Sequence, residues 1–260
     1  MMSTDLDVAI EAARAGAAVV KAGFGRPHEP DFKSSAVDPV TETDRASEAA
    51  ILDVIGRRCP RDATLSEESG GAGWDGARVW IADPLDGTVN FLHGFPHVAV
   101  SVALWDDGAP VAAAVIDPIR GEEFTAAAGA GAFLNGVPIS VSTRSELGGS
   151  LIVTGFPYDR ADRAQQYTDV VARVLRRCQG VRRTGSAALD MCYVAAGRFD
   201  AYWEYGIAAW DAAAALLLVT EAGGRYGAFG GGPYRLGTGG VVVSNGSLQD
   251  ELTSVVGTLP

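Results

Sequence analysis

Two aspartates, Asp83 and Asp86, stand three residues apart directly after a short apolar run. Pro84 stiffens the turn between them. Carboxylate oxygens are the natural ligands of hard cations such as Mg²⁺, and a strand that ends in a fixed turn can aim two carboxylates and a backbone carbonyl at one point. Gly87 permits close backbone approach, so its N–H and that of Thr88 could hold a phosphate oxygen. The turn is therefore a candidate site for a metal and a phosphate.

Three further acidic sites accompany this turn: the pair Glu67-Glu68, Asp44 and Asp211. Each also has an ordinary interpretation, as surface charge, as an acid in the first turn of a helix or as a helix cap. An isolated Asp-Pro-x-Asp-Gly turn is likewise more often simply solvated. However, Asp211 is the only charged residue between positions 204 and 221, and an acid at the head of an apolar helix needs a partner. The four acidic sites together favour a functional site over four unrelated surface or capping acids.

Two amphipathic helices are predicted ahead of these acids. The first begins at Ser3 or Thr4, either of which can cap it, and the second begins around Thr43. The expected buried faces are Leu6, Ile10, Ala13, Ala17 and Val20 in the first helix, and Ala46, Ala50, Ile51, Val54 and Ile55 in the second.

The middle of the chain has the pattern of a sheet. An apolar strand over 79–82 ends at Asp83, and alternation over 98–104 predicts a strand that is covered on both faces. A turn at Asp106–Gly108 follows. Further strands of the same meander are expected over 111–116, 122–127 and 132–134.

Strands and helices alternate after about Ser142. Strands are expected over 151–154, 199–203 and 241–244, and helices over 160–178, 187–196, 211–221 and 248–256, with Tyr167, Val170, Val171, Val174 and Leu175 inward in the helix over 160–178. No linker interrupts the chain, so residues 1–260 are expected to form one α/β domain. Its α+β front lobe over 1–143 carries most of the acidic sites, and its α/β back lobe over 144–260 carries Asp211.

Composition narrows the function further. A net charge of −11 repels nucleic acid and anionic membrane surfaces. The three cysteines, Cys59, Cys178 and Cys192, are widely spaced and odd in number, which argues against disulfides and a zinc site. The first fourteen residues carry acids and no apolar core, and no run of about 18 apolar residues occurs. We therefore expect a cytoplasmic protein with no membrane or nucleic-acid partner.

The acidic elements resemble the inositol monophosphatase family in order and spacing along nearly the whole chain. The matching segments are Asp38–Asp44, Glu67–Ser69, Trp80–Pro96, Thr154–Tyr158, Gly185–Ala188, Tyr202–Glu204 and Trp210–Gly224. The resemblance implies the layered α/β/α/β/α sandwich of the Mg²⁺-dependent, lithium-sensitive sugar phosphatases. It also implies a homodimer. Two positions depart from the family pattern, because Ser66 replaces a usual Gly and Ala208 replaces a polar residue of some relatives.

The resemblance also implies roles for particular residues, with two or three Mg²⁺ per site. Glu67, Asp83 and the carbonyl of Leu85 would bind the first ion, and Asp83, Asp86 and Asp211 the second, while Glu67 would help a weaker third. Asp44 and Thr88 would orient and deprotonate the attacking water, so that Asp44, Thr88 and Glu67 form the catalytic set. The implied substrate contacts are Asp86, Gly87, Thr88, Gly185, Ser186, Ala187, Glu204 and Asp211.

The expected function is Mg²⁺-dependent hydrolysis of a small phosphorylated polyol, first of all myo-inositol 1-phosphate (EC 3.1.3.25). Histidinol phosphate is the alternative substrate, followed by fructose 1,6-bisphosphate and 3′-phosphoadenosine 5′-phosphate. A non-catalytic interaction module is disfavoured because every implied ligand position is filled. A calcium-binding module is disfavoured because no DxDxDG loop occurs.

Overall fold

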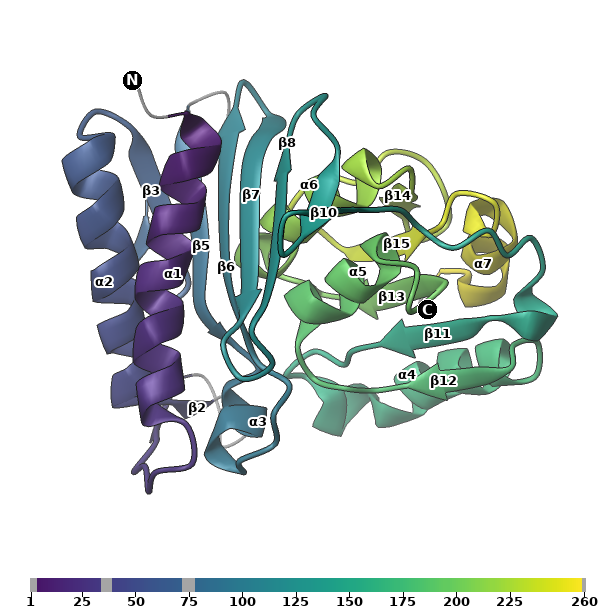
Figure 1. Cartoon of the computed structure of the whole chain (residues 1–260). Helices are drawn as coiled ribbons and strands as arrows, with labels where there is room; N and C mark the ends of the chain where they lie inside the picture. Colours follow the sequence, from purple (N-terminus) through teal and green to yellow (C-terminus); the bar gives the residue numbers. More distant parts are fainter. Residues whose placement is uncertain (1–3, 34–38, 72–77, 259–260) are drawn as a thin grey trace.

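Helices and sheets alternate in five layers in the computed structural model (Figure 1), which describes residues 4–33, 39–71 and 78–258. Helices α1 (Asp5–Gly23) and α2 (Glu42–Arg58) form the first layer and pack on one face of an eight-stranded sheet. Thr4 caps α1 and Thr41 caps α2, each through a capping box with the acid three residues later. The orientation of α2 matters most, because its first turn contributes to the site described below.

The eight-stranded sheet has the order β10-β9-β8-β7-β6-β5-β3-β4. Its neighbouring strands pair antiparallel except β3 with β5, which are parallel, with the end of β3 opposite Ala82 of β5. The strands are β3 (Ala63–Ser66), β4 (Gly70–Gly71), β5 (Val79–Asp86), β6 (Ala99–Asp106), β7 (Ala109–Asp117), β8 (Glu122–Ala127), β9 (Ala132–Leu134) and β10 (Val137–Ile139).

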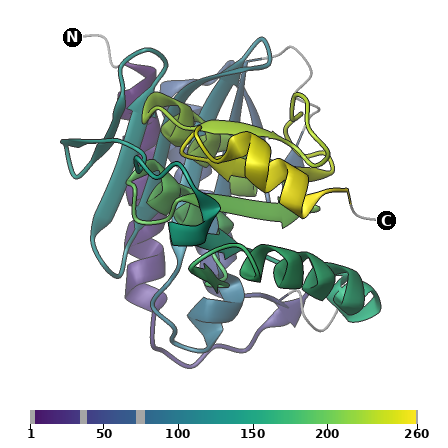
Figure 2. The same ribbon diagram turned by 90° about the vertical axis from the view of Figure 1, so that its right-hand side faces the viewer.

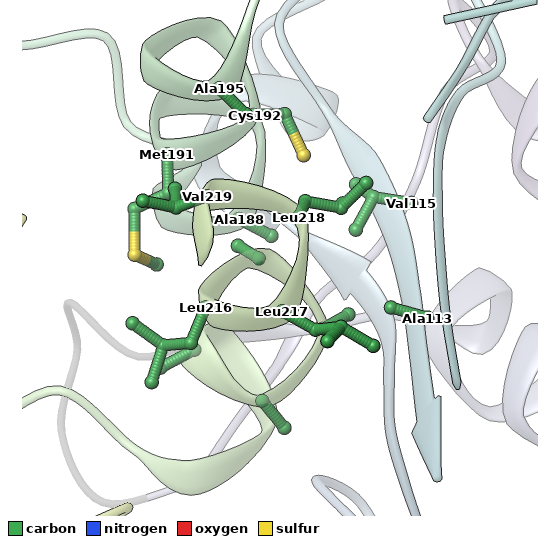
Figure 3. Packing of buried hydrophobic residues seen from close by; sticks show 14 of the residues in the cluster. Ala113, Val115, Ala188, Met191, Cys192, Ala195, Leu216, Leu217, Leu218 and Val219 are labelled. Carbon is green, nitrogen blue, oxygen red and sulfur yellow. The ribbon is translucent and has the colours of Figure 1, made fainter. Parts of the chain in front are cut away.

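The middle layer consists of α5 (Ala187–Ala195) and α6 (Ala209–Glu221), which lie between the two sheets. The alanine and leucine residues of α6 occur on all its faces, which is the pattern of a helix that is enclosed by the protein. Leu217 and Leu218 point toward Ala113 and Val115 of β7 (Figure 3). The same hydrophobic cluster continues to the second sheet at Val243, so this layer joins both sheets.

The second sheet has five strands in the order β12-β11-β13-β15-β14. Strand β11 pairs parallel with β12 and β13, and the other pairs are antiparallel. Helices α4 (Arg160–Leu175) and α7 (Gln249–Val256) cover its outer face (Figure 2). The strands are β11 (Leu151–Thr154), β12 (Gly180–Arg182), β13 (Ala201–Tyr205), β14 (Arg225–Ala228) and β15 (Gly240–Ser244).

Short elements complete the part of the chain that the structure describes. Strands β1 (Asp31–Phe32) and β2 (Pro39–Val40) pair antiparallel, the helix α3 (Thr88–Leu92) follows β5, and a 3₁₀ turn spans Leu147–Gly149. No described helix has the length and apolar character that crossing a membrane requires. The predicted cap Ser3 and the start of the Asp38–Asp44 segment lie outside the described residues.

Several sequence-based predictions of the elements were wrong in detail. Strand β5 does not end at Asp83 but continues to Asp86, with an irregular register between these two residues. On α2, Ala46 is exposed, whereas Ser47 and Glu48 are buried because Ser47 bonds to β5 and Glu48 bonds to the turn after β3. Leu6, Ile10, Ala50 and Val171 are only half-buried, and Leu175 is exposed at the end of α4, which stops three residues earlier than predicted. The elements β1, β2, β3, β4, β10, β12, β14 and α3 were not predicted.

Candidate active site

Asp83 and Asp86 lie at the end of β5, and Asp86 contacts the N-terminal end of α5. Asp83 is 1% exposed, and its Oδ1 accepts a hydrogen bond from the Leu85 N–H at 3.0 Å. The Asp86 carboxylate lies at the start of α5, where it accepts bonds from Ser186 Oγ at 2.6 Å and from the Ala188 N–H at 2.8 Å. These donors are those that a helix N-terminus offers to an anion. The turn is thus tied to the middle layer.

Gly87 begins α3 in a conformation that favours glycine, with φ of +92°. A Cβ here would stand 3.1 Å from the carbonyl oxygens of Gly185 and His97. Such contacts are tighter than most Cβ atoms make, so a larger residue would push apart the backbones of β5 and of the segment before α5 and would also be strained at this φ. The predicted role of the Gly87 and Thr88 N–H groups toward a phosphate oxygen stays a prediction.

Asp44 and Thr88 come together although 44 residues separate them. The Asp44 side chain is fully buried, and its Oδ2 accepts bonds from the Thr41 N–H at 2.8 Å and the Thr41 hydroxyl at 2.5 Å. Its Oδ1 lies 3.0 Å from Thr88 Oγ1, which is also 3.0 Å from the Leu85 carbonyl. Since a hydroxyl has one proton, Thr88 donates to one of these acceptors at a time.

The paired glutamates follow the end of β3, beside the end of β5. The Glu67 N–H donates to the Ala82 carbonyl at 3.2 Å. Lys33 Nζ lies 2.8 Å from Glu67 Oε1 and 2.5 Å from Glu68 Oε1. Glu48 of α2 fixes the following turn, because its Oε1 accepts bonds from the Ser69 N–H at 3.0 Å and the Glu68 N–H at 3.2 Å.

Asp211 stands in the first turn of α6 and accepts a hydrogen bond from the Ala208 N–H at 2.9 Å. The capping interpretation of this acid is therefore correct. Capping does not exhaust its role, because the charges of Asp86 and Glu67 are close enough to affect its pKa. Asp211 thus accepts a hydrogen bond at the start of its helix, and the charges of Asp86 and Glu67 raise its pKa.

Burial and mutual repulsion raise the pKa values of these carboxyl groups. Burial raises the pKa of Asp83 well above its usual range, and the charges of Glu67, Asp86 and Asp211 raise it further. Burial and the neighbouring charges of Asp86 and Glu67 do the same to Asp211. Burial also raises the pKa of Asp86 to about 6, although bonds from Ser186 and Ala188 oppose the shift. Crowded acids of this kind suit a hard cation, whose charge offsets their repulsion.

The acidic side chains of the site bond to other groups of the protein in this structure. Among the described residues, no three Asp, Glu, His or Cys side chains are arranged as a ready metal-binding cluster. Leu85 holds Asp83, the start of α5 holds Asp86, and Lys33 holds Glu67. The residue types and their shared repulsion fit Mg²⁺, and each carboxylate has acceptor sites beyond those that its present partners use. The predicted ligand set stays a prediction.

Glu204 of β13 occupies a space that a glycine leaves open. A Cβ on Gly155 would stand 1.9 Å from Glu204 Oε2, so any larger residue would displace the Glu204 carboxyl group. The Tyr202 hydroxyl donates to the same oxygen. Burial raises the pKa of Glu204 to about 7, and the Tyr202 bond and the charge of Arg183 oppose this. Glu204 is thus a carboxyl group that can be either donor or acceptor near neutral pH.

The other predicted substrate contacts, Gly185, Ser186 and Ala187, differ in their surroundings. Gly185 adopts a φ of +95° beside Asn90 and Arg183. Ser186 is buried and donates its hydroxyl to Asp86, and the Ala187 N–H donates to Asp86 at 3.2 Å. These two donors therefore support Asp86 in this arrangement.

Sequence reasoning missed four residues that connect the site. Asn90 Nδ2 donates to the His97 carbonyl at 2.8 Å and to the Thr184 carbonyl at 2.9 Å, which joins α3 to the segment before α5. Beneath it, His97 Nε2 lies 3.0 Å from Asp190 Oδ1. The fourth is Glu48. Asp190 had a usable signal, because it is a lone acid within the apolar helix α5.

Comparison with known proteins adds independent information. A model of the inositol monophosphatase family matches residues 1–259. The chain is 44% identical over 260 residues to the inositol-1-monophosphatase of Synechocystis sp., across 100% of this chain and 91% of that protein. It is 42% identical over 254 residues to Nus factor SuhB of Pseudomonas aeruginosa, across 94% and 92%. The solved inositol monophosphatase of Anabaena (Nostoc) sp. matches with a TM-score of 0.86 and 41% identity, across 96% and 94%. The expected α/β fold is confirmed.

Proposed function

Because this chain belongs to the inositol monophosphatase family, we propose that it hydrolyses a small phosphate monoester in a Mg²⁺-dependent reaction. Its first candidate substrate is myo-inositol 1-phosphate. The observation that carries the proposal is the contact between the fully buried Asp44 and the Thr88 hydroxyl, beside four carboxylates that repel one another. A cytoplasmic homodimer with two or three Mg²⁺ per site completes the proposal.

Asp44 and Thr88 have the arrangement of a proton relay. Thr41 saturates one carboxylate oxygen of Asp44, so the other is directed at Thr88 Oγ1. When Thr88 donates to Asp44, a lone pair of its oxygen is free to accept a proton from an attacking water. The proton thus moves toward Asp44, whose burial already raises its pKa and so favours its protonated form.

Glu67, Asp83, Asp86, Asp211 and the carbonyl of Leu85 would hold the metal ions. The chemistry that Mg²⁺ supplies when bound is neutralisation of the phosphate dianion and stabilisation of the leaving oxygen. The backbone N–H groups of Gly87 and Thr88 would hold a phosphate oxygen at the start of α3. Glu204 would accept or donate a hydrogen bond at a hydroxyl of the polyol.

Similarity alone does not separate the phosphatase function from the function of a Nus factor. The relatives at 44% and 42% identity carry different names, an inositol-1-monophosphatase and a Nus factor. The net charge of −11 disfavours direct contact with nucleic acid, and the paired Asp44 and Thr88 favour catalysis. Histidinol phosphate remains the alternative substrate, ahead of fructose 1,6-bisphosphate and 3′-phosphoadenosine 5′-phosphate.

The test is phosphate release from these four compounds with Mg²⁺ and again with a chelator. We expect release only with Mg²⁺ and the highest kcat/KM for inositol 1-phosphate. Asp83→Asn should lose turnover and stay folded, whereas Asp107→Asn, an exposed charge at a distant turn, should match the parent protein. Release that persists in chelator, or an active Asp83→Asn variant, would refute the metal mechanism. Another preferred compound would change only the substrate.

A further inference from the structure

Arg183 lies beside the groups assigned to the polyol, and neither the sequence pattern nor the proposed mechanism gives it a role. Its Nη1 is 2.7 Å from the place where a Cβ on Gly185 would stand. The side chain therefore folds back over a glycine of the site. The same glycine is adjacent to Thr184, whose carbonyl Asn90 ties to α3.

The Phe156 ring contacts the Arg183 guanidinium, and the lack of a Cβ on Gly185 leaves room for it. Its central carbon lies 5.9 Å from the centre of the Phe156 ring, within the range of a cation–π contact. Phe156 follows Gly155, the glycine that makes room for Glu204. Two glycines and one ring thus bring an arginine and a glutamate to the same end of the site.

The charge of Arg183 reaches the interior of the site, while its side chain is exposed. Burial raises the pKa values of Glu204 and Asp190, and the positive charge of Arg183 opposes both shifts. Lys33, another cation near the site, is already paired with Glu67 and Glu68. In the part of the chain that the structure describes, the contact of the Arg183 guanidinium is the Phe156 ring, so its N–H donors face no protein acceptor.

We propose that Arg183 forms a subsite for a second phosphate on the substrate, so that the enzyme accepts polyol bisphosphates and cleaves the ester that lies at Asp44 and Thr88. The planar guanidinium fork matches two phosphate oxygens, which a lone ammonium does not. A second phosphate would otherwise meet a strongly acidic site, and Arg183 is the cation that offsets this repulsion. This inference rests on the proposed phosphatase function.

The test compares fructose 1-phosphate with fructose 1,6-bisphosphate, which differ only in the second phosphate. We expect Arg183→Gln to raise KM for the bisphosphate about tenfold, the loss of one charge-assisted contact, and to leave KM for the monophosphate and both kcat values within about twofold. Arg183→Lys should recover part of the loss. The control is Arg182→Gln, an adjacent exposed arginine on the edge strand β12 whose Nη1 contacts its neighbour Val181.

Equal losses on both compounds would overturn the subsite, and so would an equal effect of Arg182→Gln. The competing explanation is that Arg183→Gln alters the proposed homodimer and raises KM for both compounds alike. Light scattering of each variant detects such a change in oligomeric state. If the parent protein releases phosphate from neither these compounds nor any other compound of the panel above, the phosphatase proposal fails by itself. Calorimetric binding of both compounds with Ca²⁺ then decides the role of Arg183, because equal affinities in the parent and Arg183→Gln would overturn it.

Discussion

The hydrogen bond between Thr88 and Asp44 is the contact at residue scale on which the proposed chemistry depends. Thr88→Ala removes the hydroxyl that would take the proton of the attacking water. We expect kcat to fall about 10²- to 10⁴-fold, the usual contribution of a positioned base, while KM stays within about threefold. Steady-state kinetics will measure both. Thr88→Ser keeps the hydroxyl and should keep most of the activity, whereas a loss expressed only in KM would show that Thr88 merely binds phosphate.

Glu204 supplies a prediction about pH. Its carboxyl has a usual pKa of 4.5 that burial raises to about 7. The folded state therefore holds a proton there that the unfolded state has lost, and the resulting stability is present below pH 4.5 and disappears as pH rises through 7. The shift corresponds to roughly 3 kcal/mol.

Glu204→Gln keeps an acceptor for the Tyr202 hydroxyl and removes this titration. In chelator, the parent protein should lose stability relative to Glu204→Gln between pH 5 and pH 8. Denaturant unfolding at several pH values measures the difference. A constant difference across that range would contradict the raised pKa.

Helix α2 shows, at the scale of elements, why its position was predictable and its buried face was not. Apolar periodicity found the helix, and Ile51, Val54 and Ile55 are buried as predicted. Ser47 and Glu48 replace Ala46 and Ala50 on that face because they bond to the Pro84 carbonyl and to the Glu68–Ser69 turn. A hydrophobicity pattern scores both polar residues as exposed, since their partners lie 37 and 21 residues away.

The hydrogen bonds from the Glu68–Ser69 turn to Glu48 lead to a prediction about metal affinity. Glu48→Ala should free the turn that carries Glu67, a proposed ligand. Groups that orient ligands typically contribute 10- to 100-fold, so we expect at least tenfold more Mg²⁺ to be needed for half-maximal activity. The Mg²⁺ concentration that raises the melting temperature should shift in parallel. Asp53→Ala, on the exposed face of the same helix, should leave both unchanged.

At the scale of the whole molecule, the acids that the sequence analysis grouped come from different layers of the fold. Asp44 comes from the outer helices, Asp83 and Asp86 from the first sheet, and Asp211 from the middle layer. Local pattern found the longer elements between them. It missed β4 and β12, which are too short to show a period, and the Asn90 contacts, which exist only after the layers pack.

This convergence predicts that metal supports the fold as well as the reaction. The acids that meet at the ends of these layers repel one another, so Mg²⁺ that binds the folded state should raise the melting temperature. Asp83→Asn replaces a buried acid, whose pKa is raised, with a neutral side chain that can still accept from Leu85. At pH 7 in chelator, this variant should melt several degrees above the parent protein. Asp83 is ionised in the unfolded chain, so folding must either bury its charge or bind a proton, and a neutral asparagine avoids this cost.

The same variant should lose most of the Mg²⁺-dependent increase, since it lacks a ligand. Asp107→Asn removes an equal charge at an exposed turn with φ of +49°, which asparagine tolerates, and should behave as the parent in both respects. Melting curves with chelator and with millimolar Mg²⁺ test both effects together. If Asp83→Asn gained as much from Mg²⁺ as the parent does, the metal would bind away from this cluster. The repulsion among the acids would then have to be relieved by Lys33 and the helix N-termini alone.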